Sequence, residues 1–156
     1  METEIKKYTL NPNSISDINY ELIMYDLLYE DKSKHSILSI NFKGIYKAGS
    51  EGNNDALFMR GIIAMAINLW ITEGLVLDFT QLSYEWGNTL LKIFDPIELY
   101  LENKSLVCYV LANKKNKKSI SDILNLGREQ GIDSSILCDT IENVFTRFKS
   151  KLPVWR

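Results

Sequence analysis

Two short and almost entirely apolar runs constrain the fold of this chain more than any other feature. They cover residues 75–79 (Leu-Val-Leu-Asp-Phe) and 106–111 (Leu-Val-Cys-Tyr-Val-Leu). Consecutive apolar residues over so short a length are typical of a strand that is covered on both faces of a parallel sheet. Parallel strands need long crossover connections, which are usually helices. We therefore predict that the two runs are neighbouring inner strands of one sheet.

The clearest helical pattern lies before the first of these strands, in residues 55–73. Its apolar side chains recur at spacings of three and four, and Gly74 supplies a stop. They are Leu57, Met59, Ile62, Ile63, Ala66, Ile67, Trp70 and Ile71. We expect residues 48–54 to form a mobile loop, with Asn53 or Asn54 as the helix cap. Ile67 and Trp70 are expected to pack the helix onto the sheet.

The later elements alternate between helix and strand. They are expected at residues 89–101 (helix, with a kink or a break into two at Pro96), 119–130 (helix, capped by Ser119 and ended by Gly131), 134–137 (strand) and 139–151 (helix, capped by Asp139 or Thr140). Proline removes a helical hydrogen bond, whereas Ser and Thr favour the capping position. The alternation again predicts crossover connections.

The N-terminal part is less clear. Residues 1–16 are polar and are expected to form a lead-in segment or a short edge strand. Residues 20–29 fit either a helical stripe or a strand buried on both faces, and we favour the strand. A strand is also expected over residues 36–46, where apolar and polar residues alternate. The predicted order is β-β-α-β-α-β-α-β-α.

The fold class follows from this order. We predict one α/β domain over residues 1–156, with a mixed, largely parallel sheet of about four to five strands and helices packed on it. The composition, with 46% hydrophobic and 24% charged residues, is that of an ordinary globular protein. It excludes collagen, low-complexity disorder and a disulfide-dense miniprotein.

Charge and cysteine content bear on location and partners. The net charge of −2 argues against a dedicated nucleic-acid surface. The chain shows no secretory signal and no run of about 20 apolar residues, so we expect a cytoplasmic protein away from the membrane. Cys108 and Cys138 both lie in apolar runs and are expected to be structural thiols. Whether the protein forms a homodimer stays open.

The densest group of residues suited to binding or chemistry follows the strand at 75–79. It comprises Asp78, Tyr84, Glu85, Trp86, Gly87 and Asn88. Ligands of parallel sheets bind at the carboxyl ends of strands, and a helix opened by Gly87 and Asn88 would present backbone N–H groups to an anion or oxyanion. Glu85 would act as a general acid or base if it were buried. Alternatively, Tyr84 and Trp86 fill space in the core and Asp78 binds turn amides.

Few residues point to catalysis. The single histidine, His35, lies among polar residues and is expected to be exposed. One histidine and two core-like cysteines do not provide the ligands of a zinc site. The sequence contains no phosphate-binding loop and no dinucleotide-binding fingerprint. We therefore expect no catalytic set, no metal and no cofactor.

A second candidate surface is basic. Lys114, Lys115, Lys117 and Lys118 follow the strand at 106–111. Such a run is usually a solvated surface, but it would also suit an anionic partner. Few aromatic residues accompany it, so a base-stacking nucleic-acid site is poorly supported. Acidic residues gather instead at positions 17–31, where they would suit a basic partner.

The element order and the stretch Leu-Val-Leu-Asp-Phe-Thr-Gln-Leu-Ser-Tyr at residues 75–84 resemble the STAS domain. This is the family of bacterial anti-sigma-factor antagonists and of transporter cytoplasmic tails. The resemblance covers about residues 37–148 and implies a protein-binding α/β scaffold. Antagonists of this family carry a phosphorylated Ser or Thr after the Asp-bearing strand. The nearest position here is Asn88, which cannot accept a phosphate, and Thr89 is a weak substitute.

Three functions are consistent with these observations. The first is a non-catalytic module that binds another protein through residues 84–88 without a phosphorylation switch. The second is an immunity or antitoxin protein that neutralises a cognate toxin, for which complementary charge speeds capture. The third is a small enzyme that uses residues 84–88 as an anion or oxyanion site. We favour the first.

Overall fold

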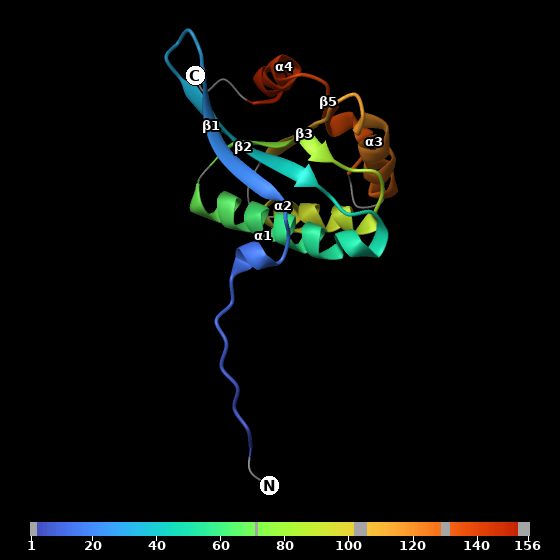
Figure 1. Cartoon of the computed structure of the whole chain (residues 1–156). Coiled ribbons are helices and arrows are strands. Elements are labelled where there is room, and N and C mark those ends of the chain that lie inside the picture. Colours follow the sequence, from blue (N-terminus) through green and yellow to red (C-terminus); the bar gives the residue numbers. More distant parts are fainter. Residues whose placement is uncertain (1–2, 71, 102–105, 129–131, 153–156) are drawn as a thin grey trace.

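The computed structural model describes residues 3–70, 72–101, 106–128 and 132–152 (Figure 1). Its strands and α-helices are β1 (Asn19–Leu28), β2 (Lys34–Ile45), α1 (Asn53–Leu69), β3 (Gly74–Ser83), α2 (Asp95–Leu101), β4 (Val107–Leu111), α3 (Lys117–Leu126), β5 (Leu137–Cys138) and α4 (Ile141–Lys151). Short 3-10 helices are η1 (Pro12–Ser14), η2 (Gly49–Gly52), η3 (Asn88–Phe94) and η5 (Ser134–Ile136).

The five strands form one mixed sheet in the order β1-β2-β3-β4-β5. Only β1 and β2 are antiparallel, and the other neighbours are parallel. Leu77 of β3 lies between Ile40 of β2 and Val110 of β4. The predicted α/β class, and the prediction that the two apolar runs are neighbouring inner strands, are therefore confirmed.

Helices cover both faces of the sheet (Figure 1). The larger core lies between the sheet and α1, η3 and α3, and it includes Phe42, Leu77 and Met59. The smaller core lies under α4, where Phe148 is fully buried against Gly74 and Ile37. The inner strands thus need apolar residues on both faces, which explains the runs that identified them.

The prediction for α1 is partly wrong. The helix begins at Asn53 after η2, so residues 48–54 are not a mobile loop and neither Asn53 nor Asn54 is the cap. Ile67 is buried as expected, but Trp70 is 43% exposed. The helix ends at Leu69 and Trp70 has an extended backbone, which turns its side chain away from the buried face. Ile71 lies outside the described residues.

β3 and the helices after it also differ from the prediction. β3 continues to Ser83, because β2 resumes pairing with it beyond a bulge near Asn41. Residues 88–101 do form two short helices, as Pro96 indicated. α3 begins after Asn116 rather than Ser119 and ends at Leu126 with Gly127 as its C-cap, while the expected stop at Gly131 lies outside the described residues.

The C-terminal elements are closer to expectation. Residues 134–136 form η5, and the strand predicted at 134–137 is reduced to Leu137 and Cys138. Thr140 caps α4, since its hydroxyl accepts a hydrogen bond from the Asn143 N–H at 3.2 Å. The cap and the end of α4 at Lys151 are confirmed.

Two predictions about the N-terminal third need correction. Residues 20–29 form a strand, but β1 is an edge strand with mostly exposed side chains and is not buried on both faces. His35 is fully buried in β2 rather than exposed. Its Nδ1 contacts the Glu73 carboxylate, and its ring lies edge-on to Tyr29 with centroids 5.4 Å apart. Residues 31–33 lie in the hairpin turn between β1 and β2, whereas His35 lies in β2. His35 is paired with Leu27 of β1, which belongs to the smaller core.

Both cysteines are free thiols, with Cys138 buried and Cys108 half-buried. Desolvation raises the pKa of the Cys108 thiol to about 12, so it stays protonated and unreactive at neutral pH. Among the described residues, no helix has both the length and the apolar character needed to cross a membrane.

Candidate functional site

Residues 84–88 connect β3 to η3 at the carboxyl ends of β2 and β3. The Tyr46 N–H donates to Ser83 O at 2.8 Å, and the Gly49 N–H donates to Trp86 O at 3.3 Å. These bonds hold the segment against η2, which follows β2. The carboxyl ends of neighbouring parallel strands are where α/β proteins place their ligands. The position of the predicted segment is therefore suited to binding.

Tyr84 belongs to the framework of this site and not to its surface. It is buried, and its ring packs edge-on to Tyr46 with centroids 5.2 Å apart. Its hydroxyl donates to Gly87 O at 3.2 Å. Burial raises the pKa of Tyr84 to about 12, and burial likewise raises the pKa of Tyr46. For Tyr84, the alternative in which it fills the core is correct.

Two glycines allow the segment to adopt its shape. Gly49 has φ +64°, and a Cβ there would lie 2.6 Å from Trp86 Cη2. Gly87 has φ +146°, and a Cβ there would lie 3.1 Å from Tyr46 Cε1. Both backbone conformations disfavour other residues. The six-membered ring of Trp86 therefore rests directly on the backbone of Gly49.

Trp86 is the most prominent side chain of the site. The Trp86 side chain is 62% exposed, although one part of its ring packs against Gly49. A shallow hollow of about 350 Å³ lies beside it, lined by Gly49, Ser50, Asn53, Trp86, Gly87, Asn88 and Thr89. We call these seven residues the Trp86 surface. The Thr89 hydroxyl donates to Asn53 Oδ1 at 2.6 Å, which joins the start of η3 to the start of α1.

Two observations bear on the predicted general acid or base and on the predicted anion or oxyanion site at residues 84–88. Glu85 is exposed, so the burial that a general acid or base at neutral pH requires is missing. Gly87 and Asn88 open a 3-10 helix of seven residues, and the Leu90 N–H already donates to Gly87 O at 3.2 Å. Gly87 and Asn88 therefore begin a 3-10 helix in place of the expected α-helix.

Asp78 is not brought to the Trp86 surface. It lies within β3, six residues or about 20 Å of extended chain before Tyr84. Its Oδ1 accepts hydrogen bonds from the Thr80 N–H at 2.8 Å and the Thr80 hydroxyl at 2.6 Å. The alternative in which Asp78 binds nearby backbone amides describes it correctly. The sequence predicts that this strand ends at Phe79, next to Asp78, whereas β3 continues to Ser83 and keeps Asp78 within the strand.

The basic candidate surface follows β4. Lys114 and Lys115 lie in the connecting segment, and Lys117 and Lys118 lie in the first turn of α3, all four of them exposed. Lys117 forms an ion pair with Asp139 at 2.7 Å, and Lys118 forms one with Asp122 at 2.9 Å. Two of the four charges are thus balanced within the chain, which weakens this surface as an anion site.

Sequence reasoning missed the residues that hold these two segments in place. Asn116 is buried, and its amide donates to Phe79 O at 2.8 Å and Leu82 O at 2.9 Å. Asn113 donates to Thr80 O at 2.9 Å. The half of β3 beyond the end of β4 is therefore paired with asparagine side chains. The sequence signal for these residues was the pair of asparagines, Asn113 and Asn116, that comes shortly after the buried strand β4.

No known protein-family model matches the sequence, and neither does any curated protein. Among the described residues, no group of three His, Cys, Asp or Glu side chains is placed to hold a metal ion. The geometry of the Trp86 surface is therefore the basis for assigning a function.

Proposed function

We propose that this protein is a non-catalytic module that binds another protein through the Trp86 surface. The observation that carries the proposal is Trp86 itself, a tryptophan that is 62% exposed yet rests on the backbone of Gly49. Exposing so large an aromatic ring to water is unfavourable in free energy, and burying the ring against a partner would remove this penalty. Tryptophan is also among the residues most enriched in interface hot spots.

The surroundings of Trp86 support this role. Gly49, Gly87 and the buried pair of Tyr46 and Tyr84 hold the segment in one conformation, so little entropy is lost on binding. Ser50 and Asn88 place polar groups at the rim of the hollow. An apolar centre with a polar rim is the usual composition of a protein interface.

The scaffold that we propose is STAS-like. The order β-β-α-β-α-β-α-β-α, on which the resemblance rests, is also the order of the strands and α-helices. The position nearest to the family's phosphoacceptor is Asn88, and the neighbouring Thr89 hydroxyl is already bonded to Asn53. Binding without a phosphorylation switch is therefore the form of the proposal.

The two alternative functions receive less support. The acidic stretch that suggested a toxin inhibitor is partly paired within the chain: Asp17 binds Lys47 at 3.9 Å, Glu21 binds Lys43 at 3.3 Å and Asp26 binds Lys34 at 3.7 Å. For the enzymatic alternative, Glu85 is exposed, so it lacks the burial that would suit a general acid or base. Both would still be revealed by the identity of a captured partner.

The test compares two tryptophans in one experiment. Wild-type, Trp86→Ala and Trp70→Ala proteins serve as baits in a native lysate, and the affinity for any retained protein is then measured by titration. Trp70 is the matched control, because it is 43% exposed and lies at the end of α1. We expect Trp86→Ala to weaken binding by about 2 kcal/mol or more, with almost no change in Tm, and Trp70→Ala to bind normally.

Two outcomes would contradict the proposal. One is a Trp86→Ala protein that unfolds while its folded fraction binds normally, which would make Trp86 a structural residue. The other is binding that falls steeply with salt and is lost in a Lys114→Ala, Lys117→Ala double variant, which would move the contact to the basic surface.

A further inference from the structure

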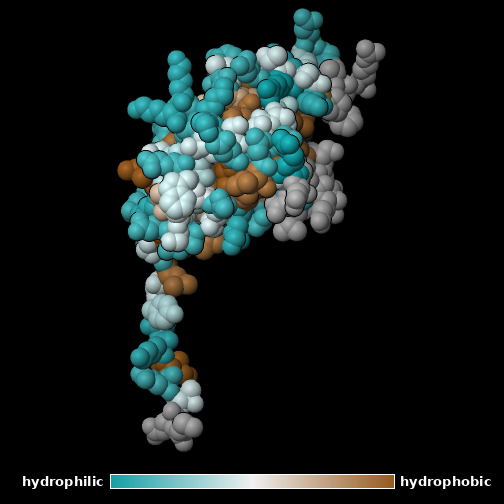
Figure 2. Space-filling model, turned by 90° about the vertical axis from the view of Figure 1, so that its right-hand side faces the viewer, coloured by the Kyte–Doolittle hydropathy of each residue, from teal (hydrophilic) through white to brown (hydrophobic). Residues whose placement is uncertain are grey.

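Residues 3–11 form an extended arm that stands away from the folded body (Figure 1). Three apolar side chains on the arm are almost fully exposed, with Ile5 at 89%, Tyr8 at 78% and Leu10 at 79%. Figure 2 shows hydrophobic side chains along the arm among hydrophilic ones. Apolar residues held in water on a projecting segment favour a contact with a second molecule.

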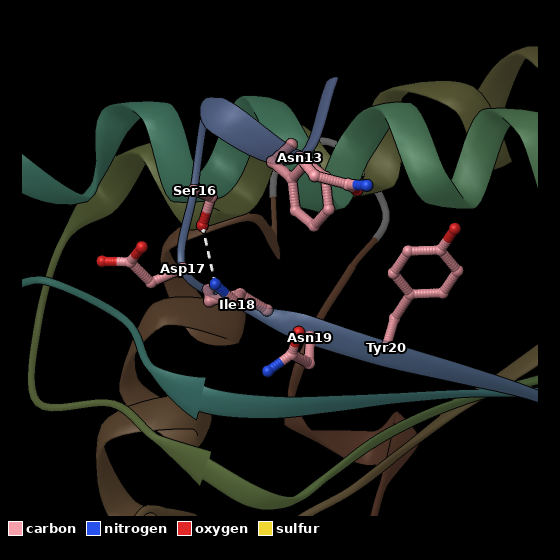
Figure 3. A pocket seen from close by; sticks show the side chains of 7 residues that line it. Asn13, Ser16, Asp17, Ile18, Asn19 and Tyr20 are labelled. Carbon is pink, nitrogen blue, oxygen red and sulfur yellow. Dashed lines mark hydrogen bonds between the residues drawn. The ribbon is translucent and has the colours of Figure 1, made fainter. Parts of the chain in front are cut away.

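The base of the arm is fixed to α1. The Ser16 hydroxyl donates to Oδ1 of the buried Asp55 at 2.6 Å. The Ile18 N–H donates to Ser16 Oγ at 3.1 Å (Figure 3). Asp55 Oδ2 also accepts the Lys47 N–H at 2.9 Å. Directly before this anchor, η1 turns the chain at Pro12. The anchor and the turn direct the arm away from its own sheet.

β1 offers a surface that an extended segment would fit. It is a ten-residue edge strand, and its outer side has no neighbouring strand among the described residues. Tyr20 and Met24 point to the same face of the sheet and are 38% and 40% exposed. A hollow of about 290 Å³ lies at the start of β1, between Asn13, Ile18, Tyr20 and Phe58 (Figure 3).

The apolar surface continues from β1 onto α1. Tyr20 contacts Phe58 of α1 with ring centroids 6.1 Å apart. Met65 and Leu69 follow Phe58 by seven and eleven positions, which places them on the same side of the helix. They are 38% and 63% exposed. The edge of the sheet and the adjoining side of α1 thus form one exposed apolar strip.

We propose that two copies of this chain exchange arms, so that the arm of each copy adds an antiparallel strand to β1 of the other. One register satisfies both charge and hydrophobicity. With Lys6 opposite Asp26, Tyr8 lies opposite Met24 and Leu10 opposite Leu22, all on the face toward α1. The same register places Ile5 opposite Leu27 on the other face. Directly opposite side chains share a face and interact in antiparallel pairs.

A second copy fits this surface better than the arm of the same chain does. Within one chain, the hydrogen bond of Ser16 to Asp55 and the turn at Pro12 direct the arm away from β1 of that same chain. In a two-fold dimer, each arm covers the partner's exposed strip while its own strip is covered in return. Pairing also occupies the free backbone groups of a long edge strand, which are otherwise an aggregation hazard. The exchange is independent of what binds the Trp86 surface.

The first test measures the oligomeric state by light scattering over a dilution series. We expect the unmodified chain to be a dimer, and a Tyr8→Ser, Leu10→Ser double variant to dissociate at concentrations at least about tenfold higher, since each change removes a large apolar contact. Leu126→Ser is the control, because Leu126 is 63% exposed but lies on α3. It should dimerise like wild type. A monomeric wild type, or a dimer unaffected by the double variant, would overturn the proposal.

The second test checks the exchange and its register. Tyr8→Cys protein is mixed with Met24→Cys protein under mild oxidation. Exchange places one new thiol of each chain side by side, so we expect a disulfide-linked heterodimer. Tyr8→Cys mixed with Ile23→Cys should not cross-link efficiently, because Ile23 lies on the opposite face. Equal cross-linking in both mixtures, or none in the first, would contradict the proposed register and exchange.

Discussion

The segments that follow β3 and β4 occupy equivalent places in the sheet but are built differently. Both leave the carboxyl ends of adjacent parallel strands. Residues 84–88 are held by glycine backbones and buried aromatic rings, and they present an exposed tryptophan. Residues 113–116 are held by asparagine side chains turned inward, and they present lysines. One segment offers apolar area and the other offers charge.

This difference shows why a run of charge is a weaker indication of a binding site than a supported aromatic residue. The lysines are displayed because Asn113 and Asn116 bind the backbone of β3, and Lys117 is balanced by Asp139. Trp86, in contrast, is exposed at a place where its supporting backbone is made rigid. A rigid, exposed ring contributes more binding free energy than a solvated charge does.

The largest effect expected from this comparison is the loss of stability in Asn116→Ala. The change leaves Phe79 O and Leu82 O without their donors and the Asn113 N–H without its acceptor. We expect the free energy of unfolding to fall by about 3 kcal/mol, because each unpaired buried group costs about 1–3 kcal/mol. Urea denaturation measures it. The control, Lys115→Ala in the same segment, should stay within about 0.5 kcal/mol of wild type. Equal stability of the two variants would show that the hydrogen bonds of the Asn116 side chain do not stabilise the fold.

A smaller loss is expected for Gly49→Ala, which tests the support beneath Trp86. The added Cβ would meet Trp86 Cη2 at 2.6 Å, and the backbone would keep a positive φ that alanine disfavours. We expect about 2 kcal/mol of destabilisation and a change in tryptophan fluorescence. Gly61→Ala is the matched control, because nothing lies within 4 Å of its Cβ position in α1. It should gain up to about 1 kcal/mol. Similar results for both glycines would contradict the close contact.

The smallest effect at neutral pH is expected for Tyr84→Phe, about 1 kcal/mol for the lost hydrogen bond to Gly87 O. The variant should also change the response to alkali. The tyrosine pKa is near 10 in the unfolded chain and about 12 at Tyr84 in the folded protein. The wild-type free energy of unfolding should therefore fall as pH rises from about 10 to 12. The fall should be shallower in Tyr84→Phe. Unchanged alkaline profiles would show that Tyr84 is not the group responsible.

Sequence reasoning succeeded where one physical effect dominated. The apolar runs of β3 and β4 require burial on both faces, so it could be predicted that these two strands lie next to each other inside the sheet. It failed where local and tertiary effects compete. Trp70 matches the helical period, but the helix ends one residue earlier. His35 follows a polar turn, but hairpin pairing carries it to a buried position.

The candidate site was located only in part. Residues 84–88 were predicted, and Trp86 is exposed at the carboxyl edge of the sheet as a binding residue would be. Gly49 and Asn53, which line the hollow beside Trp86, come from a segment that the sequence predicts to be a mobile loop. Asp78 lies at the end of the strand predicted at 75–79, but β3 continues to Ser83 and so Asp78 lies within it. Contacts between the segments after β2 and β3 depend on sheet register, which a single sequence does not specify.

The central place of β3 has a consequence for how the chain folds. β1 and β2 are joined by a short turn, so this hairpin closes locally, on a timescale of about 1–10 μs. β3 instead reaches β2 only across α1, and β4 reaches β3 only across η3 and α2. Closing such long loops is slow. Until β3 arrives, β2 exposes an apolar edge to other unfolded chains, so self-association during refolding should be greatest before the middle strand is in place.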